Sequence, residues 1–350
     1  MMKVHLVLER IINKENLSSE EAACLMQYFA DGLASPSQVG ALLTALRYKG
    51  ETSAEITGFA KEMRNRLTPA PAKSRPLLDT CGTGGSRFKV FNVSTAAAFV
   101  AASAGIHVAK HGNRAASGVC GSADVLEALG ANIHLTPQQC GESIDTVGVG
   151  FLFAPSHHPS LKSIGAVRRE LGIRTIFNIL GPLANPAGAE MQVVGVYDSS
   201  LCRTMAEALQ LLGCSTAFVV HGRIGMGEIS TIGITDVCKL QNGVIESFEL
   251  DRGSLGLNRH EPDPSFLLPA QTPTENASLL LEVLDPEAEN ELVRIQRELV
   301  AVNAAAALIA GAKAENWQEA VQYAQSLISS GSPLNILKEF ISFTNHYSSL

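Results

Sequence analysis

The chain has 350 residues, of which 46% are hydrophobic, and a formal net charge of −7 at pH 7. This length supports one large α/β domain or two smaller domains, and the composition is that of a globular protein with a well-filled core. The net negative charge gives no general attraction to nucleic acid or to anionic lipid, so any binding of anions must be local. Function therefore has to be sought in a defined site.

The seven cysteines indicate reduced thiols. Their number is odd, and no two of them have the C-x-x-C spacing typical of a zinc site. The apolar stretch at the N-terminus is too short for a secretory signal, and no apolar run reaches about 18 residues without a polar interruption. We therefore expect a cytoplasmic protein with no membrane-spanning segment.

The first ~70 residues carry helix-start signals and no strand alternation. Ser18 with Glu21 and Thr52 with Glu55 form capping-box patterns, and Ser35 precedes a proline that suits a first helical turn. These patterns predict three helices in a small helical module. The proline-rich segment 69–76 is typical of a connection to the next domain.

From residue 77 onward, short apolar strands alternate with helices. The strands are predicted at residues 77–79, 106–109, 149–153, 191–196 and 217–220. This order predicts an α/β fold with a mainly parallel central sheet covered by helices on both faces. Residues 228–249 have the composition of antiparallel strands, and residues 288–345 return to helix.

A glycine-rich loop, Gly82-Thr-Gly-Gly85, follows the first strand, and Asn92-Val-Ser-Thr95 opens the next helix. Backbone N–H groups at glycines and at a helix N-terminus bind anions, and the glycines allow close approach. Taken alone, such a loop is as often only a tight turn. It has neither the G-K-[ST] of a Walker loop nor the pattern G-x-G-x-x-G.

A second polar loop, KHGNR at residues 110–114, directly follows the next strand. A solvated basic turn is the alternative interpretation, but such turns seldom stand beside a glycine-rich loop. Ser122 is expected to cap the following helix and to offer a further phosphate donor. The two loops together predict a polyphosphate ligand.

At this point the chain resembles the anthranilate phosphoribosyltransferases, the enzymes that join anthranilate to phosphoribosyl pyrophosphate in tryptophan biosynthesis. The segments that carry the resemblance are residues 82–85, 91–95, 110–114, 121–130, 168–186 and 220–222. The resemblance implies a small N-terminal all-helical domain over residues 1–75, with helices from about 157–190 packing on it. It also implies a large α/β domain over residues 76–350, a site at the hinge between the two, and a homodimer formed through the helical domains.

The resemblance also implies site residues, position by position. Those matching contacts to phosphoribosyl pyrophosphate are Gly82, Gly85, Ser86, Val90, Asn92, Val93, Ser94, Thr95, Lys110, Asn113, Gly118 and Ser122. Those matching contacts to anthranilate are Gly82, His111, Asn113, Arg168 and Pro182. Mg²⁺ is implied as cofactor at Ser94, Gly227 and Glu228, although glycine lacks a side-chain ligand. No covalent nucleophile is implied, because positioning and electrostatics suffice for this reaction.

The chain departs from the family pattern around the polyphosphate. Ser86 stands for an acidic residue, Val90 for a threonine, residues 117–120 for Ser-Ser-Lys-Ser, and Gly227-Glu228 for an Asp-Glu magnesium pair. A lost carboxylate weakens a magnesium site, because this ion prefers oxygen ligands. Three basic residues lie near the same loops: Arg87, Lys89 and Arg223. They either contact phosphate oxygens or form a solvated basic surface.

Other functions stay open on the sequence alone. The phosphoribosyl group could pass to another aromatic amine or base, or the reaction could resemble that of a nucleoside phosphorylase. A non-catalytic paralogue that binds a regulatory ligand or nucleic acid through its basic loops is a third reading, against which the net charge weighs. His157 and His158 are interpreted as capping or surface residues in preference to a metal pair.

Overall fold

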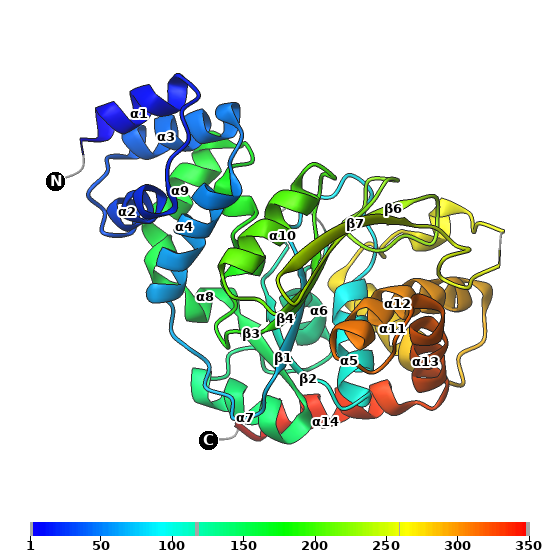
Figure 1. Ribbon diagram of the computed structural model, residues 1–350. Coiled ribbons are helices and arrows are strands. Elements are labelled where there is room, and N and C mark those ends of the chain that lie inside the picture. Colours follow the sequence, from blue (N-terminus) through cyan, green and yellow to red (C-terminus); the bar gives the residue numbers. More distant parts are fainter. Residues whose placement is uncertain (1–2, 116–118, 259, 348–350) are drawn as a thin grey trace.

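The computed structural model describes residues 3–115, 119–258 and 260–347. Four helices come first in the chain: α1 (Val4–Ile12), α2 (Ser19–Ala30), α3 (Pro36–Lys49) and α4 (Ser53–Asn65). They form a separate helical layer at one end of the molecule, at the upper left of Figure 1. The three predicted helices are confirmed, and each begins with a capping box, at Ser18, Ser35 and Thr52. Helix α1 was not predicted, since its N-cap, Lys3, makes no side-chain capping bond.

The rest of the chain is built around one sheet of seven strands in the order β3-β2-β1-β4-β5-β6-β7. The strands are β1 (Leu77–Gly82), β2 (His107–Gly112), β3 (Val149–Phe153), β4 (Met191–Gly195), β5 (Thr216–Gly222), β6 (Thr235–Gln241) and β7 (Val244–Leu250). Strands β1 to β5 pair in parallel, and β6 and β7 add an antiparallel edge. The predicted α/β class with a mainly parallel sheet is confirmed, as are the antiparallel strands within 228–249.

Helices cover both faces of the sheet. The helices after β1 are α5 (Val93–Ser103), α6 (Ser122–Ala128), α7 (Pro137–Val147), α8 (Ala154–His157), α9 (Lys162–Leu171), α10 (Leu201–Leu211), α11 (Pro273–Leu284), α12 (Glu291–Ala310), α13 (Trp317–Ser329) and α14 (Ser332–His346), of which α9 lies in the helical layer. Short 3₁₀ turns lie at Pro159–Leu161, Ile176–Asn178, Gly181–Leu183 and Pro264–Leu267. Side chains of a strand alternate between the layers: Val193 packs with α5 and α12, and Val194 with α10 and the helical layer.

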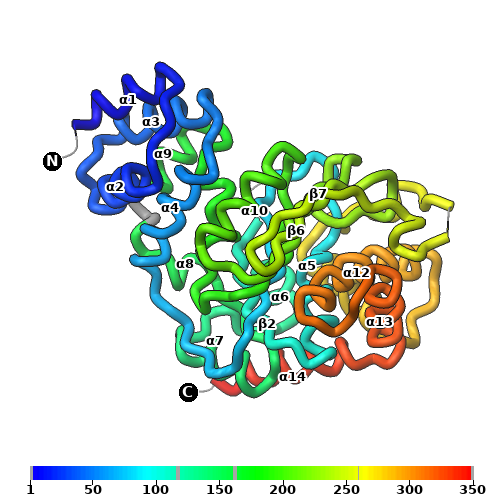
Figure 2. Tube along the Cα trace, in the orientation of Figure 1, coloured from blue at the N-terminus to red at the C-terminus, as the bar shows by residue number. Residues whose placement is uncertain are grey.

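The helical layer is completed by residues that lie far along the sequence. Helix α9 and residues 176–184 share one apolar cluster with α1 to α4, and α9 lies beside α2 to α4 in Figures 1 and 2. The rings of Phe29, Phe59 and Phe177 form a chain of edge-to-face contacts, with centroids 6.1 Å apart at each step. Arg64 of α4 donates to the carbonyl oxygens of Leu183 and Leu212, at 2.6 and 3.1 Å. The segment after β3 therefore belongs to the core of the helical layer.

Within the described residues, no helix has the length and apolar character needed to cross a membrane.

Candidate functional site

The site lies where the parallel strands end. Gly82 at the end of β1 pairs with Gly195 at the end of β4, and Thr83 donates its N–H to the Gly195 carbonyl at 2.8 Å. A Cβ at Gly82 would lie 3.1 Å from that carbonyl oxygen, so glycine permits the close approach of the two strands. The carboxyl ends of parallel strands are the usual place for ligands in such folds.

A small cavity of about 40 Å³ opens at these strand ends. Its lining includes Gly82, Ser94, Gly227, Glu228 and Asn303. A water molecule needs ~10–15 Å³ by the same measure, so the cavity has room for a few waters or a partly hydrated ion. A sugar phosphate is too large for it.

Asp79 and Lys110 are both buried and interact electrostatically next to Thr80, which lines this cavity. The Lys110 ammonium group donates to the Thr80 carbonyl at 2.5 Å and lies 3.4 Å from the Ser94 hydroxyl. Burial lowers the pKa of Lys110, and the Asp79 carboxylate opposes that shift. Burial likewise raises the pKa of Asp79, against Lys110 and two N–H donors. Lys110 is thus held between the end of β1 and the N-terminus of α5.

Asp79 also links two loops that the sequence separates by about 75 residues. One carboxylate oxygen accepts from the His111 N–H at 3.0 Å, and the other accepts from Asn185 Nδ2 at 2.8 Å. Asn185 further donates to the Ala109 carbonyl at 2.8 Å. Neither Asp79 nor Asn185 was predicted as a site residue. The available signal was an acidic side chain at the end of an apolar strand, where an unpaired charge is costly.

His111 is buried and neutral. Its Nδ1 lies 3.1 Å from the Gly181 carbonyl, which requires the proton on Nδ1 and leaves Nε2 as an acceptor. That Nε2 is buried and has no partner. Burial, together with neighbouring His158, lowers the pKa of His111 to about 3. The imidazole therefore offers a bare lone pair at neutral pH.

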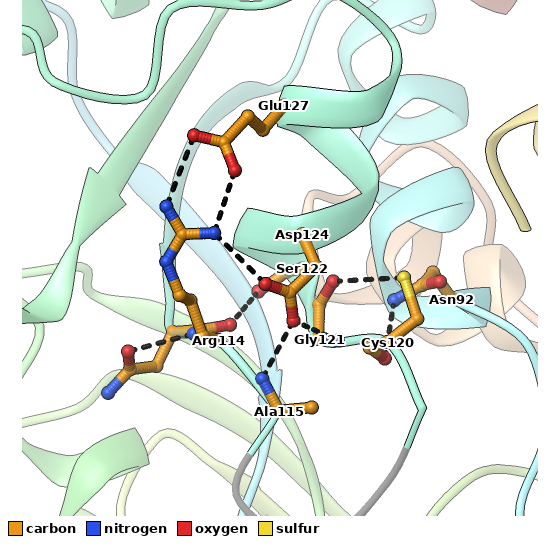
Figure 3. A network of polar contacts seen from close by, with 9 residues as sticks. Asn92, Arg114, Ala115, Cys120, Gly121, Ser122, Asp124 and Glu127 are labelled. Atoms are coloured by element: carbon orange, nitrogen blue, oxygen red, sulfur yellow. Dashed lines mark hydrogen bonds and ion pairs between the residues drawn. The ribbon is translucent and has the colours of Figure 1, made fainter. Parts of the chain in front are cut away.

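The second loop is held by a network of polar contacts (Figure 3). Arg114 pairs with Asp124 at 3.1 Å and with Glu127 at 2.7 Å, so its guanidinium group is occupied. Asp124 also accepts from the N–H groups of Ala115 and Gly121. The N-cap of α6 is Gly121, and Ser122 is the first helical residue, so the prediction that Ser122 caps this helix was wrong. Its hydroxyl instead lies 3.5 Å from the Asn113 carbonyl.

The N-terminus of α5 carries several predicted phosphate contacts. Asn92 is the N-cap, but its amide donates to the Cys120 carbonyl at 3.3 Å, and its buried Oδ1 has no partner among the described residues. Thr95 is fully buried, and within the same residues its hydroxyl has no partner either. Val93 and Val90 pack into the core of the sheet. Gly118 lies outside the described residues.

The glycine loop contacts the helical layer through Arg174. The Arg174 guanidinium donates to the Gly85 carbonyl and lies 4.2 Å from the centre of the Tyr197 ring. Arg174 was not predicted, because nothing in the sequence places it against residue 85. Ser86 faces the loop after β5, where a Cβ at Gly227 would lie 3.0 Å from its hydroxyl.

Arg168 lies on α9, away from the phosphate loops. Its guanidinium group lies 5.2 Å from the centre of the Phe177 ring, and burial lowers its pKa. Across the described chain, no carboxylate pairs with it. Pro182 directly follows Gly181, whose carbonyl accepts a hydrogen bond from His111. The Pro182 carbonyl accepts a hydrogen bond from the Gln192 side chain at 2.7 Å. No contact among the described residues joins Arg168 to the cavity.

The expectation of a surface position for two histidines was wrong. His157 and His158 are buried rather than on the surface; His157 Nδ1 lies 2.8 Å from the Thr68 carbonyl. No group of three or more metal-binding side chains gathers anywhere in the described ranges. Arg223 is held at the sheet edge by Asp236 and Glu249, so it is no free phosphate contact.

The cavity contains oxygen donors suited to a divalent cation. Glu228 is half-buried, its Oε2 is buried without a partner, and burial raises its pKa to about 7. The Ser94 hydroxyl lines the same cavity. One carboxylate and one hydroxyl fit a Mg²⁺ that keeps waters and binds substrate phosphates. Gly227 contributes no side chain.

Two family models match the chain. The helical bundle domain of the glycosyl transferase family matches residues 6–67, and the a/b domain of that family matches residues 74–334. An anthranilate phosphoribosyltransferase of Pelotomaculum thermopropionicum is 46% identical over 341 residues, which cover 97% of this chain and 96% of that relative.

Solved structures give the same result. Anthranilate phosphoribosyltransferase from Thermus thermophilus superposes with a TM-score of 0.89 at 39% identity, covering 98% of this chain and all of that one. The Saccharomyces cerevisiae enzyme, solved in complex with phosphoribosyl pyrophosphate and Mg, gives a TM-score of 0.86 at 28% identity, covering 99% and 98% of the two chains.

Proposed function

The chain belongs to the anthranilate phosphoribosyltransferase family, and from this premise we infer the reaction of its site. The enzyme transfers the phosphoribosyl group of phosphoribosyl pyrophosphate to the amine of anthranilate and releases pyrophosphate, a step of tryptophan biosynthesis. The observation that carries this conclusion is the likeness over nearly the whole chain to a family of that activity. This likeness disfavours the three alternative functions: transfer to another aromatic amine or base, a nucleoside phosphorylase reaction, and a non-catalytic binding protein.

The amine attacks C1 of the ribose as the bond to pyrophosphate breaks, with inversion at that carbon and oxocarbenium character in the transition state. The chain's own task is to align the two substrates and to stabilise the leaving group. Lys110 donates to the Thr80 carbonyl, and Thr80, Gly82 and Ser94 at the start of α5 line the same cavity, so this end of the sheet offers a cation and backbone N–H groups to the phosphates. The bare Nε2 of His111 suits an N–H of the aromatic amine.

Arg168 is the cation we assign to the anthranilate carboxylate. Its guanidinium is unpaired in the described structure and stacks on Phe177, so it can receive a carboxylate without breaking an existing pair. We also assign Pro182 and Asn113 to the lining of the anthranilate site, on the basis of the family resemblance. The phosphoribosyl pyrophosphate contacts assigned above remain proposals on the same basis.

We assign Mg²⁺ to the Ser94 hydroxyl and the Glu228 carboxylate. Bound there, the ion would neutralise charge that develops on pyrophosphate. Two observations support this assignment. The buried Oε2 of Glu228 has no hydrogen-bond partner among the described residues, and the yeast relative was solved with Mg bound.

We also propose a cytoplasmic homodimer that associates through its helical domains, with a domain division near residue 75 and residues 157–190 assigned to the helical part. All seven cysteines are free, which suits a reducing compartment. The division follows the apolar cluster that joins α9 to α1–α4.

Turnover tests the function directly. Purified protein with Mg²⁺ and phosphoribosyl pyrophosphate should consume anthranilate, followed as a fall in anthranilate fluorescence. Arg168→Ala should raise KM for anthranilate about tenfold or more, because a charge-assisted pair is worth ~1.5–3 kcal/mol. KM for phosphoribosyl pyrophosphate should not change.

Arg169→Ala is the matched control, since Arg169 is the neighbouring, exposed arginine of the same helix. It should leave both KM values unchanged. A folded protein that shows no turnover at saturating substrates would refute the assignment of the reaction.

A further inference from the structure

Two loops at the site, separated by about 140 residues, pack against each other. The Phe88 N–H donates to the Gly225 carbonyl at 3.0 Å, which fixes residues 86–89 on residues 225–228. The space where Gly227 would carry a Cβ is taken by the Ser86 hydroxyl at 3.0 Å. On the other side, a Cβ at Gly195 would lie 1.7 Å from the Gly227 carbonyl oxygen. The small residues at 86, 195 and 227 thus form one tightly packed contact.

This packing leaves the metal end of the cavity with a single carboxylate. Glu228 is the acidic residue that lines it, and neither Ser86 nor Gly227 supplies another. Phosphoribosyl pyrophosphate carries a diphosphate and a monophosphate, so one Mg²⁺ balances only part of its charge. The remaining positive charge has to come from side chains.

Most cations near these loops are already engaged. Lys110 is bound from below by the Thr80 carbonyl and faces Asp79. Arg114 pairs with Asp124 and Glu127 on the second loop. Arg223 pairs with Asp236 and Glu249 at the sheet edge. Arg114 and Arg223 would each have to break an ion pair to reach the diphosphate, whereas Lys110 acts on it from its buried position.

Lys89 differs from these residues. It is partly buried and makes no ion pair within the described structure, and it interacts electrostatically with both Glu228 and Arg174. Arg174 is itself fixed by the Gly85 carbonyl and the Tyr197 ring. The hydrogen bond from the Phe88 N–H to the Gly225 carbonyl places residue 89 beside the loop that carries Glu228. An unpaired cation at this end of the cavity suits an anionic group of the substrate.

We propose that Lys89, with Arg174 behind it, binds the diphosphate of phosphoribosyl pyrophosphate directly, on the side where Gly227 offers no metal ligand. The chain consequently binds this substrate with one divalent cation, held by Ser94 and Glu228. The proposal rests on the function proposed above and adds a substrate-binding residue and a metal count to it.

Substrate binding and metal counting test this proposal without turnover. Isothermal titration of phosphoribosyl pyrophosphate at saturating Mg²⁺ should show Lys89→Met weakening binding about tenfold or more, the loss expected of one charge-assisted contact. Lys89→Arg should restore most of the affinity, and anthranilate binding should not change. Titration with Mn²⁺, followed by its electron paramagnetic resonance signal, should give one ion per chain with substrate present.

Arg223→Gln is the matched control, because it removes a positive charge that is near in sequence to the loop but paired elsewhere. It should leave affinity for the substrate unchanged. Unchanged binding by Lys89→Met, or two Mn²⁺ ions per chain in the wild type, would overturn the inference while the proposed function stands. No binding of phosphoribosyl pyrophosphate by the wild type would refute the proposed function itself.

Discussion

The buried histidines at the hinge are held neutral by their surroundings. His111 hydrogen-bonds to the Gly181 carbonyl and His158 to the Ala184 backbone, and their ring centres lie 5.2 Å apart. Burial, aided by the neighbouring histidines, lowers the pKa of His111 to about 3 and that of His158 to about 4. An unfolded chain would protonate both near pH 6.5.

These shifts predict acid sensitivity. Because the folded-state pKa values lie below the unfolded ones, the unfolded chain binds more protons below pH 6.5 and stability falls as the pH drops toward 4. At pH 5 each histidine should cost ~2 kcal/mol relative to pH 7.5. Urea unfolding at the two pH values should show a loss that is about 2 kcal/mol smaller in His158→Asn than in the wild type.

His5→Asn is the control for this experiment, since His5 is exposed on α1. Its loss of stability between pH 7.5 and pH 5 should equal that of the wild type. An equal loss in His158→Asn would show that His158 already carries a proton in the folded protein.

At the level of single residues, the sequence could place the site but not its pairings. Gly82, Ser94 and Glu228 line one cavity, and the family resemblance assigns all three to the site. The partner of Arg223 lies on β6 and β7, and that of Arg174 is a backbone carbonyl. Such pairings depend on tertiary packing, which local sequence does not encode. The sequence therefore could not show which basic loop residues are paired within the protein and which are free to bind a ligand.

At the scale of elements, helix α12 supports the metal end of the cavity through one polar side chain. Asn303 stands in an alanine-rich stretch; its Oδ1 accepts from the Ile229 N–H at 2.9 Å, and its Nδ2 donates to the Ile229 carbonyl at 2.9 Å. This bidentate contact fixes the loop that carries Glu228. The sequence suggested only a close-packed helix here.

Asn303→Ala should therefore affect both stability and metal binding. It leaves a buried N–H and C=O of Ile229 without partners, at a cost of about 1–3 kcal/mol in the free energy of unfolding. Calorimetric titration of Mg²⁺ in the presence of pyrophosphate should show weaker binding, because Glu228 is no longer held in place. Thermal unfolding measures the stability loss.

Asn335→Ala on α14 serves as the control, since Asn335 is an exposed asparagine on a helix of the same domain. It should change neither quantity by a measurable amount. Destabilisation by Asn303→Ala with unaltered Mg²⁺ binding would mean that the loop keeps its position without α12.

Element order was predictable because each parallel strand is a short apolar run with a turn at its end. The prediction for residues 149–153 has the bounds of β3, whereas β1 and β2 extend three residues beyond their predicted ends. Those extra residues, 80–82 and 110–112, lie at the site and do not continue the apolar run, so the apolar pattern that predicts a strand ends before the strand does. Helix α11 was missed, although Thr272, Pro273 and Glu275 give it a capping box.

At the scale of the whole molecule, the helical layer exposes large apolar side chains. Leu6, Ile12, Leu33 and Tyr48 have exposed fractions of 50, 54, 61 and 77%. All four lie in the first 48 residues, which also build the layer's own buried cluster. Several exposed large apolar side chains on one domain are a feature of association surfaces.

This surface predicts how the dimer should respond to charge. Light scattering after size exclusion should give the wild type twice the 37.1 kDa mass of one chain. The double variant Leu33→Asp with Tyr48→Asp should raise the dissociation constant at least about tenfold, because it places charge in an apolar contact. Val244→Asp, on exposed β7, is the matched control and should stay dimeric. A monomeric wild type, or a double variant that remains dimeric while Val244→Asp dissociates, would move the interface away from the helical layer.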